Sequence, residues 1–399
     1  MYDFNIQGST NSTTEILRTA GDEARKNFQE NLGSLGTNYE ICVPSEKLGV
    51  INRFFLQEIA REALPDQRVK VCFRHLTPGS HDVKILHNKK YKKAHYGNLM
   101  VCGSIWLCAV CASKISERRK KELIQAVNNH QGGLAMVSFT MRHSAGDSLK
   151  ENLDILTNSY RSVTSGRWYQ NLKTRFKIIG SVSNLEITYG NNGWHPHKHV
   201  LLFFKYDITG KTIEELRKQL TEVYLKSLSK HGGWGLDRVA VDVQEAKTEK
   251  QKYAEYMAKF DKNPSKDVWG VEAEMTKSHV KAVAQGGKSY WELLKDLSVT
   301  GEYKYLLLIR EYAKVIKGKQ SLVYSKGLRK KLDLGQQLTD LEIAEEQDEE
   351  AILLASIAKD IWQAVTKAGL RGELLQVSHD GDLSKIEAFL RGFYKNKGK

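Results

Sequence analysis

The chain has 399 residues, 41% of them hydrophobic and 27% charged, so it is long enough for two to three domains with cores of their own. This composition excludes a collagen-like protein, a disulfide scaffold and a wholly disordered chain. The formal net charge of +14 predicts an anionic partner, and nucleic acid is favoured over an acidic membrane surface.

The sequence favours a cytoplasmic protein without a membrane-spanning segment. The opening residues MYDFNIQGSTNSTTE have neither the basic start nor the apolar centre of a signal peptide. No stretch approaches the roughly 20 apolar residues that a spanning helix needs. The five cysteines are odd in number and unevenly placed, which favours metal or thiol chemistry in a reducing compartment.

Positive charge is concentrated in the middle of the chain. Residues 61–331 carry a net charge of +22, whereas residues 1–60 carry −3 and residues 332–399 carry −5. Solubility alone does not require positive and negative charge to be separated into different segments of the chain. The middle span is therefore predicted to bind a polyanion. Three local clusters contribute to the excess: Lys89, Lys90, Lys92 and Lys93, then Arg118, Arg119, Lys120 and Lys121, then Lys326 with Arg329, Lys330 and Lys331.

The first 130 residues divide into two segments. Residues 1–64 are polar and are expected to form an accessory arm with helical patches at 14–32 and 51–63. Residues 65–130 form a basic segment that holds four of the five cysteines.

Hydrophobic periodicity predicts alternating strands and helices over residues 131–300. In chain order we expect a strand at 134–141, a helix at 148–175, strands at 176–189 and 194–204, a helix at 212–229, a strand at 239–243 and a helix at 246–260. This β-α-β-β-α-β-α order predicts a ferredoxin-like split βαβ unit with an antiparallel sheet, so the expected fold class is α+β.

Residues 301–399 are predicted to form a separate helical accessory domain. Helices are expected at 303–317, 343–368 and 386–393. An acidic run at 345–350 sets off the last part of this segment.

Three histidines alternate along the predicted strand 194–204. His195, His197 and His199 are two residues apart, so their side chains lie on one face of the strand, where neighbouring members can bind one metal ion. Nitrogen ligands alone favour zinc, whereas an added carboxylate favours a harder ion such as Mg²⁺ or Mn²⁺. Glu186 supplies that carboxylate if its strand pairs with the histidine strand as a hairpin.

Two tyrosines share one face of the helix predicted at 246–260. Tyr253 and Tyr256 are three residues apart, and Lys259 lies about one turn from Tyr256. A tyrosine near a metal-bound phosphate can attack phosphorus as a phenolate while the ion and a lysine stabilise the developing charge. Tyrosines on a helix are also common core residues, so this interpretation depends on the histidine strand.

The cysteines of the basic segment have the spacing of a metal site. Cys108 and Cys111 form a CxxC turn, and Cys72 and Cys102 precede it. Four thiolates complete a closed tetrahedral zinc site. His75 could replace one ligand, and buried free cysteines or a redox pair are the alternatives.

The histidine strand followed by the tyrosine helix resembles the HUH endonucleases, in particular the rolling-circle plasmid replication initiators. Three stretches are similar to motifs of that family: SFTMR at 138–142, GWHPHKH at 193–199 and YMAK at 256–259. The cysteine segment is similar as well. The resemblance extends from about residue 72 to about residue 324, and the histidine motif is its most specific part.

The resemblance implies a site-specific DNA nickase with an HUH nuclease core at 131–300, a zinc-bearing segment before it and a helical domain after it. A divalent ion on His197 and His199, with Glu186 or His195, would hold the scissile phosphate, and Tyr256 would attack it. The products would be a 5′-phosphotyrosine link and a 3′-OH that primes rolling-circle replication. Partners would be origin DNA, single-stranded at the nick, and a host helicase and polymerase.

Two positions depart from the family pattern. Lys198 stands between the two family histidines, where an apolar residue is usual. The tyrosine motif aligns in two registers, one of which puts Phe260 at the position of a second tyrosine. Both registers favour Tyr256 as the nucleophile, with Tyr253 as the alternative, and the group that acts in termination stays open.

Further side chains suit contacts with DNA, and other functions remain as rivals. Arg142 and Lys198 add positive charge near the histidines. Tyr91, Trp168 and Trp194 suit stacking on single-stranded DNA or belong to the core. The rival functions are a relaxase or a single-strand transposase of the same chemistry, and a non-enzymatic zinc-containing DNA-binding regulator.

Overall fold

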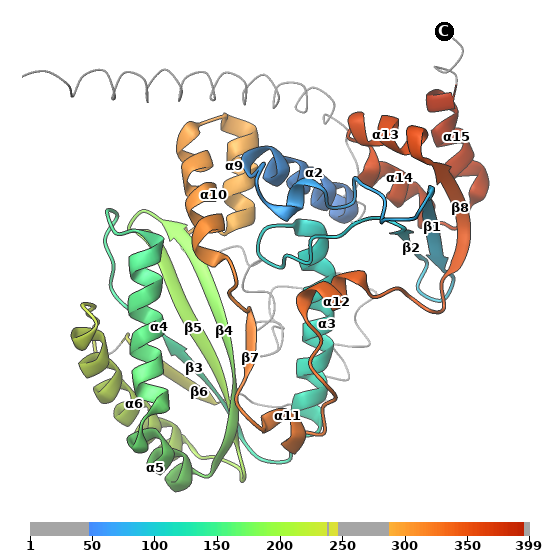
Figure 1. The fold of residues 1–399 in the computed structure, drawn as a ribbon. Coiled ribbons are helices and arrows are strands. Elements are labelled where there is room, and N and C mark those ends of the chain that lie inside the picture. The colour runs from blue at the N-terminus through green and yellow to red at the C-terminus, as the bar shows by residue number, and fades with distance from the viewer. Residues whose placement is uncertain (1–47, 238, 246–286, 395–399) are drawn as a thin grey trace, which may run out of the picture. The chain divides into compact units, whose positions relative to one another are not determined.

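The computed structural model describes residues 48–237, 239–245 and 287–394 (Figure 1). The chain divides into two compact units. Unit 1 comprises Met1–Met100, Leu294–Arg310 and Gln347–Lys399, and unit 2 comprises Val101–Leu293 and Glu311–Glu346, as far as these ranges are described. Helices α9 (Tyr290–Thr300) and α10 (Tyr303–Ile316) include the points where the chain passes between the units.

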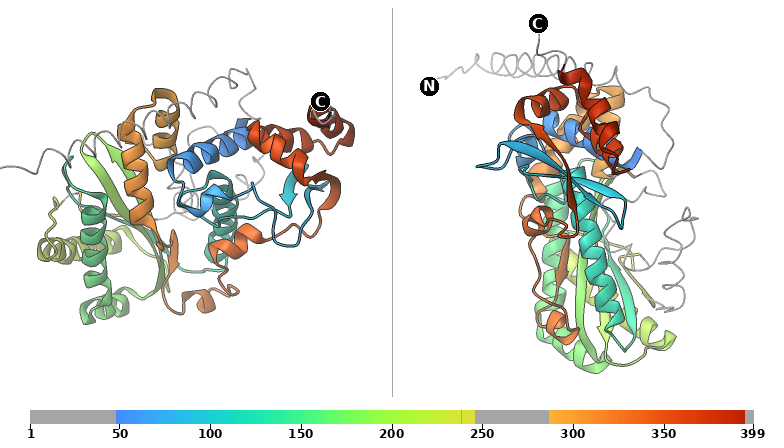
Figure 2. Two further views of the ribbon diagram at one scale, coloured as in Figure 1. Left: turned by 45° about the horizontal axis from the view of Figure 1, so that its top comes forward. Right: turned by 90° about the vertical axis from the view of Figure 1, so that its right-hand side faces the viewer.

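Unit 2 is built on a five-stranded antiparallel sheet. The strand order is β6 (Val241–Glu245), β3 (Leu134–Phe139), β5 (Gly193–Phe204), β4 (Ile178–Gly190) and β7 (Leu322–Tyr324). Helices α4 (Leu149–Ser165), α5 (Arg167–Phe176) and α6 (Gly210–Lys230) lie on one side of this sheet, and α3 (Ala109–Asn128) lies on the other (Figures 1 and 2).

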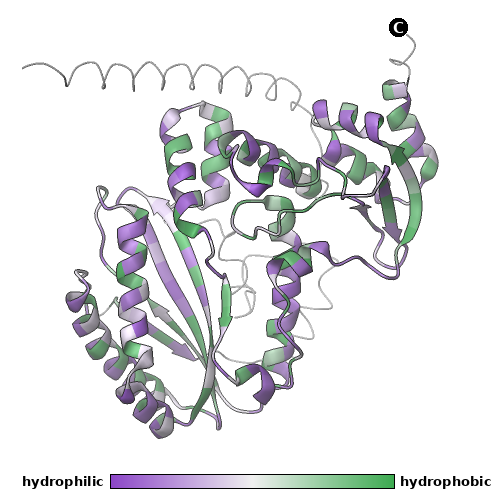
Figure 3. Ribbon diagram, in the orientation of Figure 1, coloured by the Kyte–Doolittle hydropathy of each residue, from purple (hydrophilic) through white to green (hydrophobic). Residues whose placement is uncertain are grey.

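Local sequence signals explain the helices that cover the first face. Ser148 accepts a hydrogen bond from the backbone N–H of Glu151, and Glu151 accepts one from Ser148, so a capping box begins α4. The buried residues of α4 recur at helical spacing and face the sheet, and Figure 3 shows the resulting alternation of hydrophobic and hydrophilic bands. Phe139 on β3 packs edge-on against Tyr160 of α4 and Tyr224 of α6.

The opposite face of the sheet is hydrophobic at one end only. There the strand residues Leu134, Met136, Val182, Leu201 and Phe203 form one cluster with residues of α3, β7 and the short helix α11 (Leu328–Lys331). Helix α12 (Asp340–Glu345) also packs against α3. The other end of this face, which carries the histidines of β5, lies outside that cluster.

Unit 1 contains a three-stranded antiparallel sheet in the order β2 (Lys93–Gly97), β1 (Asp82–Asn88) and β8 (Ile352–Ala358). The other described elements that lie wholly in this unit are α2 (Leu48–Ala63), the 3₁₀ turn η1 (Arg68–Lys70), α13 (Lys359–Lys367), α14 (Arg371–Ser378) and α15 (Leu383–Tyr394).

A buried ion pair connects the elements of unit 1. The Arg371 guanidinium pairs with the Glu58 carboxylate, and the two residues are 1% and 4% exposed. The same guanidinium donates to the carbonyl oxygens of Phe73, at 2.8 Å, and Cys72, at 3.3 Å. The Tyr96 hydroxyl donates to the carbonyl oxygen of Arg371 at 2.7 Å. Helices α2 and α14 and strand β2 therefore share one polar network.

The α+β class with antiparallel sheets is confirmed, and the strands predicted at 134–141, 176–189, 194–204 and 239–243 correspond to β3, β4, β5 and β6. The predicted helix 148–175 is divided at Gly166 into α4 and α5. The predicted helices 14–32 and 246–260 lie outside the described residues.

The prediction of a single helix over residues 343–368 is wrong in the middle of that range. Helix α12 ends at Glu345, residues 352–358 form β8, and α13 begins at Lys359. A short apolar run such as ILLASIA suits either a strand or a buried helix, and here its pairing with β1 decides the outcome. Residues 301–399 are therefore not wholly helical. Among the helices the structure describes, none is long and apolar enough to cross a membrane.

The Glu58→Gln substitution should destabilise unit 1. Burial alone would raise the pKa of Glu58, but the charges of Arg371, Arg61 and Arg74 and a hydrogen bond from Arg61 together lower it. The neutral amide leaves these arginines without their buried counter-charge, so we expect a loss of about 3 kcal/mol in the free energy of unfolding, measured by urea denaturation.

The effect should depend on pH. Because the folded-state pKa lies below its ordinary value of 4.5, the advantage of Glu58 is present above that value and is lost as the pH falls below it. Glu222→Gln, which breaks the exposed ion pair with Lys226, is the control and should have no measurable effect. A Glu58→Gln protein as stable as the wild type at neutral pH would contradict this account.

Candidate metal centre and the adjoining pocket

Strands β4 and β5 bring one carboxylate and two imidazoles together. Glu186 on β4 is paired directly with His197 on β5, and His199 lies two residues further along the same face. The Glu186 Oε2 atom lies 2.7 Å from His197 Nε2 and 3.0 Å from His199 Nε2. The three ligand atoms lie within 4.8 Å of one another, so this group could hold a metal ion.

The two histidines favour the ionised form of the Glu186 carboxylate. Burial alone would raise the pKa of Glu186, but hydrogen bonds from His197 and His199 and their positive charges lower it well below its usual range. The carboxylate is therefore ionised at neutral pH. Two nitrogen ligands and one carboxylate oxygen leave further coordination positions open for a substrate oxygen.

Strand β3 supports the orientation of one ligand. His199 Nδ1 shares a hydrogen bond of 2.9 Å with Ser138 Oγ. When Nε2 is free to bind a metal, Nδ1 carries the proton and donates to the hydroxyl. Such a second hydrogen bond fixes the ring orientation and the tautomer of a ligating histidine.

His195 has a different environment from the other two histidines. Its Nε2 shares a hydrogen bond of 2.9 Å with Thr140 Oγ1, and its ring centre lies 4.8 Å from that of His143. Burial, followed by the nearby charges of His197 and His143, lowers the pKa of His195 to about 4. The structure therefore groups Glu186, His197 and His199 and leaves His195, a predicted ligand, beside them.

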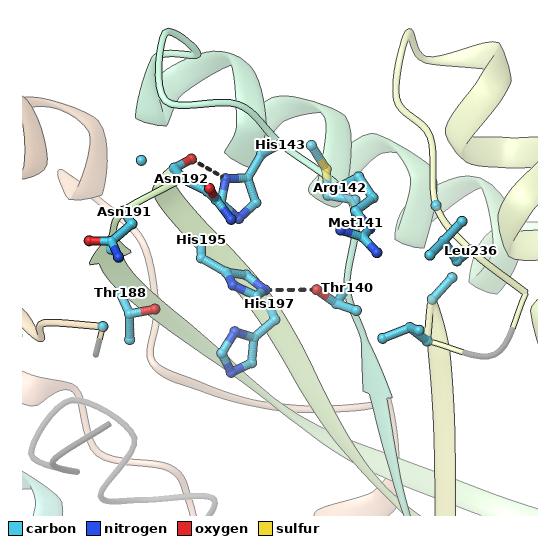
Figure 4. Close-up of a pocket in the computed structure, with 16 residues that line it drawn as sticks. Thr140, Met141, Arg142, His143, Thr188, Asn191, Asn192, His195, His197 and Leu236 are labelled. Atoms are coloured by element: carbon cyan, nitrogen blue, oxygen red, sulfur yellow. Dashed lines mark hydrogen bonds between the residues drawn. The ribbon is translucent and has the colours of Figure 1, made fainter. Parts of the chain in front are cut away.

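Glu186, His197 and His199 form the candidate metal-binding group, called the metal group below. A cavity of about 530 Å³ opens beside it. His195 and His197 lie on its wall, between the turn at Asn191 and the loop at Leu236 (Figure 4). His143 Nδ1 donates to the carbonyl oxygen of Asn192 at 2.7 Å and so ties the loop after β3 to the β4–β5 turn. A substrate in this cavity would contact the metal group through His197.

Three of the four cysteines predicted to bind zinc lie together in unit 2. Cys102, Cys108 and Cys111 are buried, and their sulfur atoms lie within 4.8 Å of one another. Three thiolates fit three positions of a tetrahedral metal site, for which Cys72 is the predicted fourth ligand.

The basic residues predicted to contact DNA have different surroundings. Lys89, Lys90, Lys92 and Lys93 are exposed at the turn between β1 and β2, Arg118 is exposed on α3, and Arg142 is exposed at the rim of the cavity. Arg119 is buried, donates to the carbonyl oxygen of Leu338 and pairs with Asp340, so its guanidinium is engaged within unit 2.

Lys198 lies on the sheet face opposite the histidines. Its Nζ atom lies 5.1 Å from the centre of the Tyr160 ring. Burial, followed by the charge of Lys319, lowers the pKa of Lys198 to about 8. The predicted nucleophiles Tyr253 and Tyr256 and the predicted Lys259 lie outside the described residues.

Sequence reasoning missed several residues of the cavity. Thr140, His143 and Asn192 meet there because β3 pairs with β5, and no local pattern signals that contact. Among the aromatic residues considered for stacking, Trp194 is buried and its indole donates to Glu311, whereas Tyr91 is 59% exposed.

Two of the known proteins to which this chain is similar are named rep. The chain is 26% identical to a protein named "Protein rep" from Streptomyces lividans over 352 residues, covering 71% of this chain and 76% of that protein. It is 28% identical to a "Protein rep" from Bacillus amyloliquefaciens over 148 residues, covering 36% of this chain and 41% of that protein. No protein-family model matches the chain, and no solved structure gives a significant match.

A third match is shorter. The chain is 32% identical over 132 residues to a "Neomycin resistance protein" from Streptomyces cyanogenus, covering 26% of this chain and 30% of that protein. The two longer matches confirm the resemblance to the replication initiators named Rep.

Substitution of Glu186 or His199 should strongly weaken binding of a divalent ion. We expect Glu186→Gln and His199→Ala to weaken binding of Mn²⁺ by more than the roughly 10- to 100-fold typical of removing a supporting residue, because each removes a ligand atom. Isothermal titration calorimetry measures the affinity. His143→Ala, which changes a histidine of the same cavity outside the group, is the matched control and should retain binding. Equal affinities for all four proteins would show that the ion binds elsewhere.

Proposed function

We propose that this protein is a plasmid replication initiator that nicks one DNA strand at the origin. In this proposal a tyrosine attacks the scissile phosphate with the help of a divalent ion. The cleaved strand remains attached through a 5′-phosphotyrosine link, and the released 3′-OH primes rolling-circle replication. The relatives named rep support replication initiation.

One observation supports the nicking chemistry above the others: Glu186, His197 and His199 converge on two central strands beside an open cavity. The strand order β6-β3-β5-β4 places β5 between β3 and β4, as in a split βαβ unit. This arrangement supports the proposal that unit 2 contains an HUH nuclease core. The further division into segments 1–64, 65–130, 131–300 and 301–399 is part of the same proposal.

The residues around the cavity would have separate roles in binding the metal ion and the DNA. Glu186, His197 and His199 would bind Mg²⁺ or Mn²⁺, since a carboxylate in the ligand set favours a hard cation. When bound, the ion would polarise the scissile phosphate. Ser138 would hold His199 in its ligating tautomer. Arg142, exposed at the rim of the cavity, would contact a neighbouring phosphate.

The covalent step needs a nucleophile, and the sequence pattern favours Tyr256. Its phenolate oxygen would form a bond to phosphorus while the bond between phosphorus and the 3′ oxygen breaks, and that oxygen would take up a proton to become the 3′-OH. Lys259 would stabilise the developing charge. Tyr253 is the alternative nucleophile.

A structural metal and further partners complete the proposal. We assign zinc to the site of Cys72, Cys102, Cys108 and Cys111, because a closed set of four thiolates is a typical structural zinc site. The exposed lysines at 89–93 would contact phosphates of the double-stranded origin. A host helicase and polymerase would then act at the nick.

A covalent-adduct assay tests the proposal. Purified full-length protein is incubated with Mn²⁺ and supercoiled plasmid that carries its own replication region. We expect nicked circles with covalently attached protein, and we expect Tyr256→Phe to reduce adduct formation at least about a thousandfold, because phenylalanine has no nucleophilic oxygen. Tyr253→Phe is the matched control and should retain the adduct.

Two outcomes would count against this proposal. Absence of nicking by the wild-type protein would favour the non-enzymatic DNA-binding regulator. A normal adduct yield from Tyr256→Phe would refute the assignment of the nucleophile.

A further inference from the structure

Strand β5 is held in place differently in its two halves. Leu201 and Phe203, in its C-terminal half, belong to the hydrophobic cluster against α3. The metal group lies on the N-terminal half, outside that cluster. Trp194 directly precedes His195 and is only 2% exposed, so the contacts that hold Trp194 also hold the part of the strand that carries the ligands.

Helix α10 contacts Trp194 through the carboxylate of Glu311. The indole Nε1–H donates to Glu311 Oε2 at 2.8 Å. The other oxygen, Oε1, accepts a hydrogen bond of 2.8 Å from the backbone N–H of Leu149, the first residue of α4. Negative charge at the N-terminus of a helix is favourable, because the free backbone N–H groups of the first turn point towards it. One carboxylate therefore joins β5, α4 and α10.

The backbone and the ring of Trp194 make further contacts. Its carbonyl oxygen accepts a hydrogen bond of 3.1 Å from Asn152 Nδ2, and Asn152 is 1% exposed. Its ring packs edge-on against Tyr189, with 5.0 Å between the ring centroids, and lies 6.0 Å from the ring of Tyr312, which follows Glu311 in α10. A hydrogen bond to the indole N–H adds direction to this packing. Glu311 therefore determines how the indole is oriented between Tyr189 and Tyr312.

We propose that Glu311 is a positioning residue of the metal group: through Trp194 it holds the N-terminal half of β5 where His197 and His199 face Glu186. This inference deepens the proposed function and rests on it, since the metal group would hold the scissile phosphate. A set of ligands binds an ion well only when its members are held within about 0.5 Å of the required geometry. Loss of the hydrogen bond between Glu311 and Trp194 loosens this end of the strand, and the ligand atoms then spend part of the time outside that limit.

The affinity of the full-length protein for Mn²⁺, measured by isothermal titration calorimetry, tests this inference. We expect Glu311→Ala to bind Mn²⁺ about tenfold more weakly than the wild type, the lower end of the range for residues that support a ligand. Trp194→Phe keeps an aromatic ring and removes the indole N–H, so it should lose a similar amount. The double variant should lose no more than either single variant, because all three lack the same hydrogen bond.

Glu151 provides a matched control. Its carboxylate accepts a hydrogen bond of 3.2 Å from the backbone N–H of Ser148, so it stabilises the same end of α4 within that helix instead of through β5. Glu151→Ala should lower the midpoint of urea denaturation, because it removes the capping box, and should bind Mn²⁺ like the wild type. The comparison separates a positioning role of Glu311 from a general loss of stability at this end of α4.

The outcomes distinguish this inference from the proposed function. Wild-type affinity of Glu311→Ala for Mn²⁺, or additive losses in the double variant, overturns the positioning role, even if the wild type nicks its plasmid. Equal losses in Glu311→Ala and Glu151→Ala also overturn it, because the stability of α4 would then explain both. A loss confined to Glu311→Ala and Trp194→Phe, in a protein that forms no covalent adduct, supports the positioning role and overturns the proposed nicking. A wild-type protein that binds no Mn²⁺ overturns both.

Discussion

The pairing register of β4 and β5 is the constraint on which the candidate site depends. Glu186 faces His197 only because the two residues are direct partners in this ladder. A shift of one residue would turn Glu186 to the opposite face of the sheet and separate it from both histidines. Hydrophobic contacts along the same strand fix the register, since Leu201 and Phe203 are fully buried in the cluster against α3.

One sheet face therefore serves two purposes along the length of β5. Its C-terminal half anchors the strand in the core, and its N-terminal half presents the metal group and the cavity. Ligands on central strands of a packed sheet are held more precisely than ligands on loops. The cavity is completed by loops at the strand ends, such as those at His143 and Leu236, which can vary without disturbing the ligands.

The sequence predicted the strands well because strands follow local periodicity, and the same period of two puts His197 and His199 on one face, where the structure brings them to Glu186. The alternation of His195, His197 and His199 along the strand gives no reason to separate one histidine from the others. His195 differs because its Nε2 shares a hydrogen bond with Thr140, which the β3–β5 pairing brings next to it. Strand β8 was taken for a helix because its pairing with β1 is distant in sequence.

The most direct test of the central claim is an anomalous diffraction measurement on crystals of the full-length protein grown with Mn²⁺. The account predicts an anomalous peak within bonding distance of Glu186 Oε2, His197 Nε2 and His199 Nε2, with His195 still hydrogen-bonded to Thr140. The absence of a peak at this position, with Glu186 still hydrogen-bonded to both histidines, would contradict it.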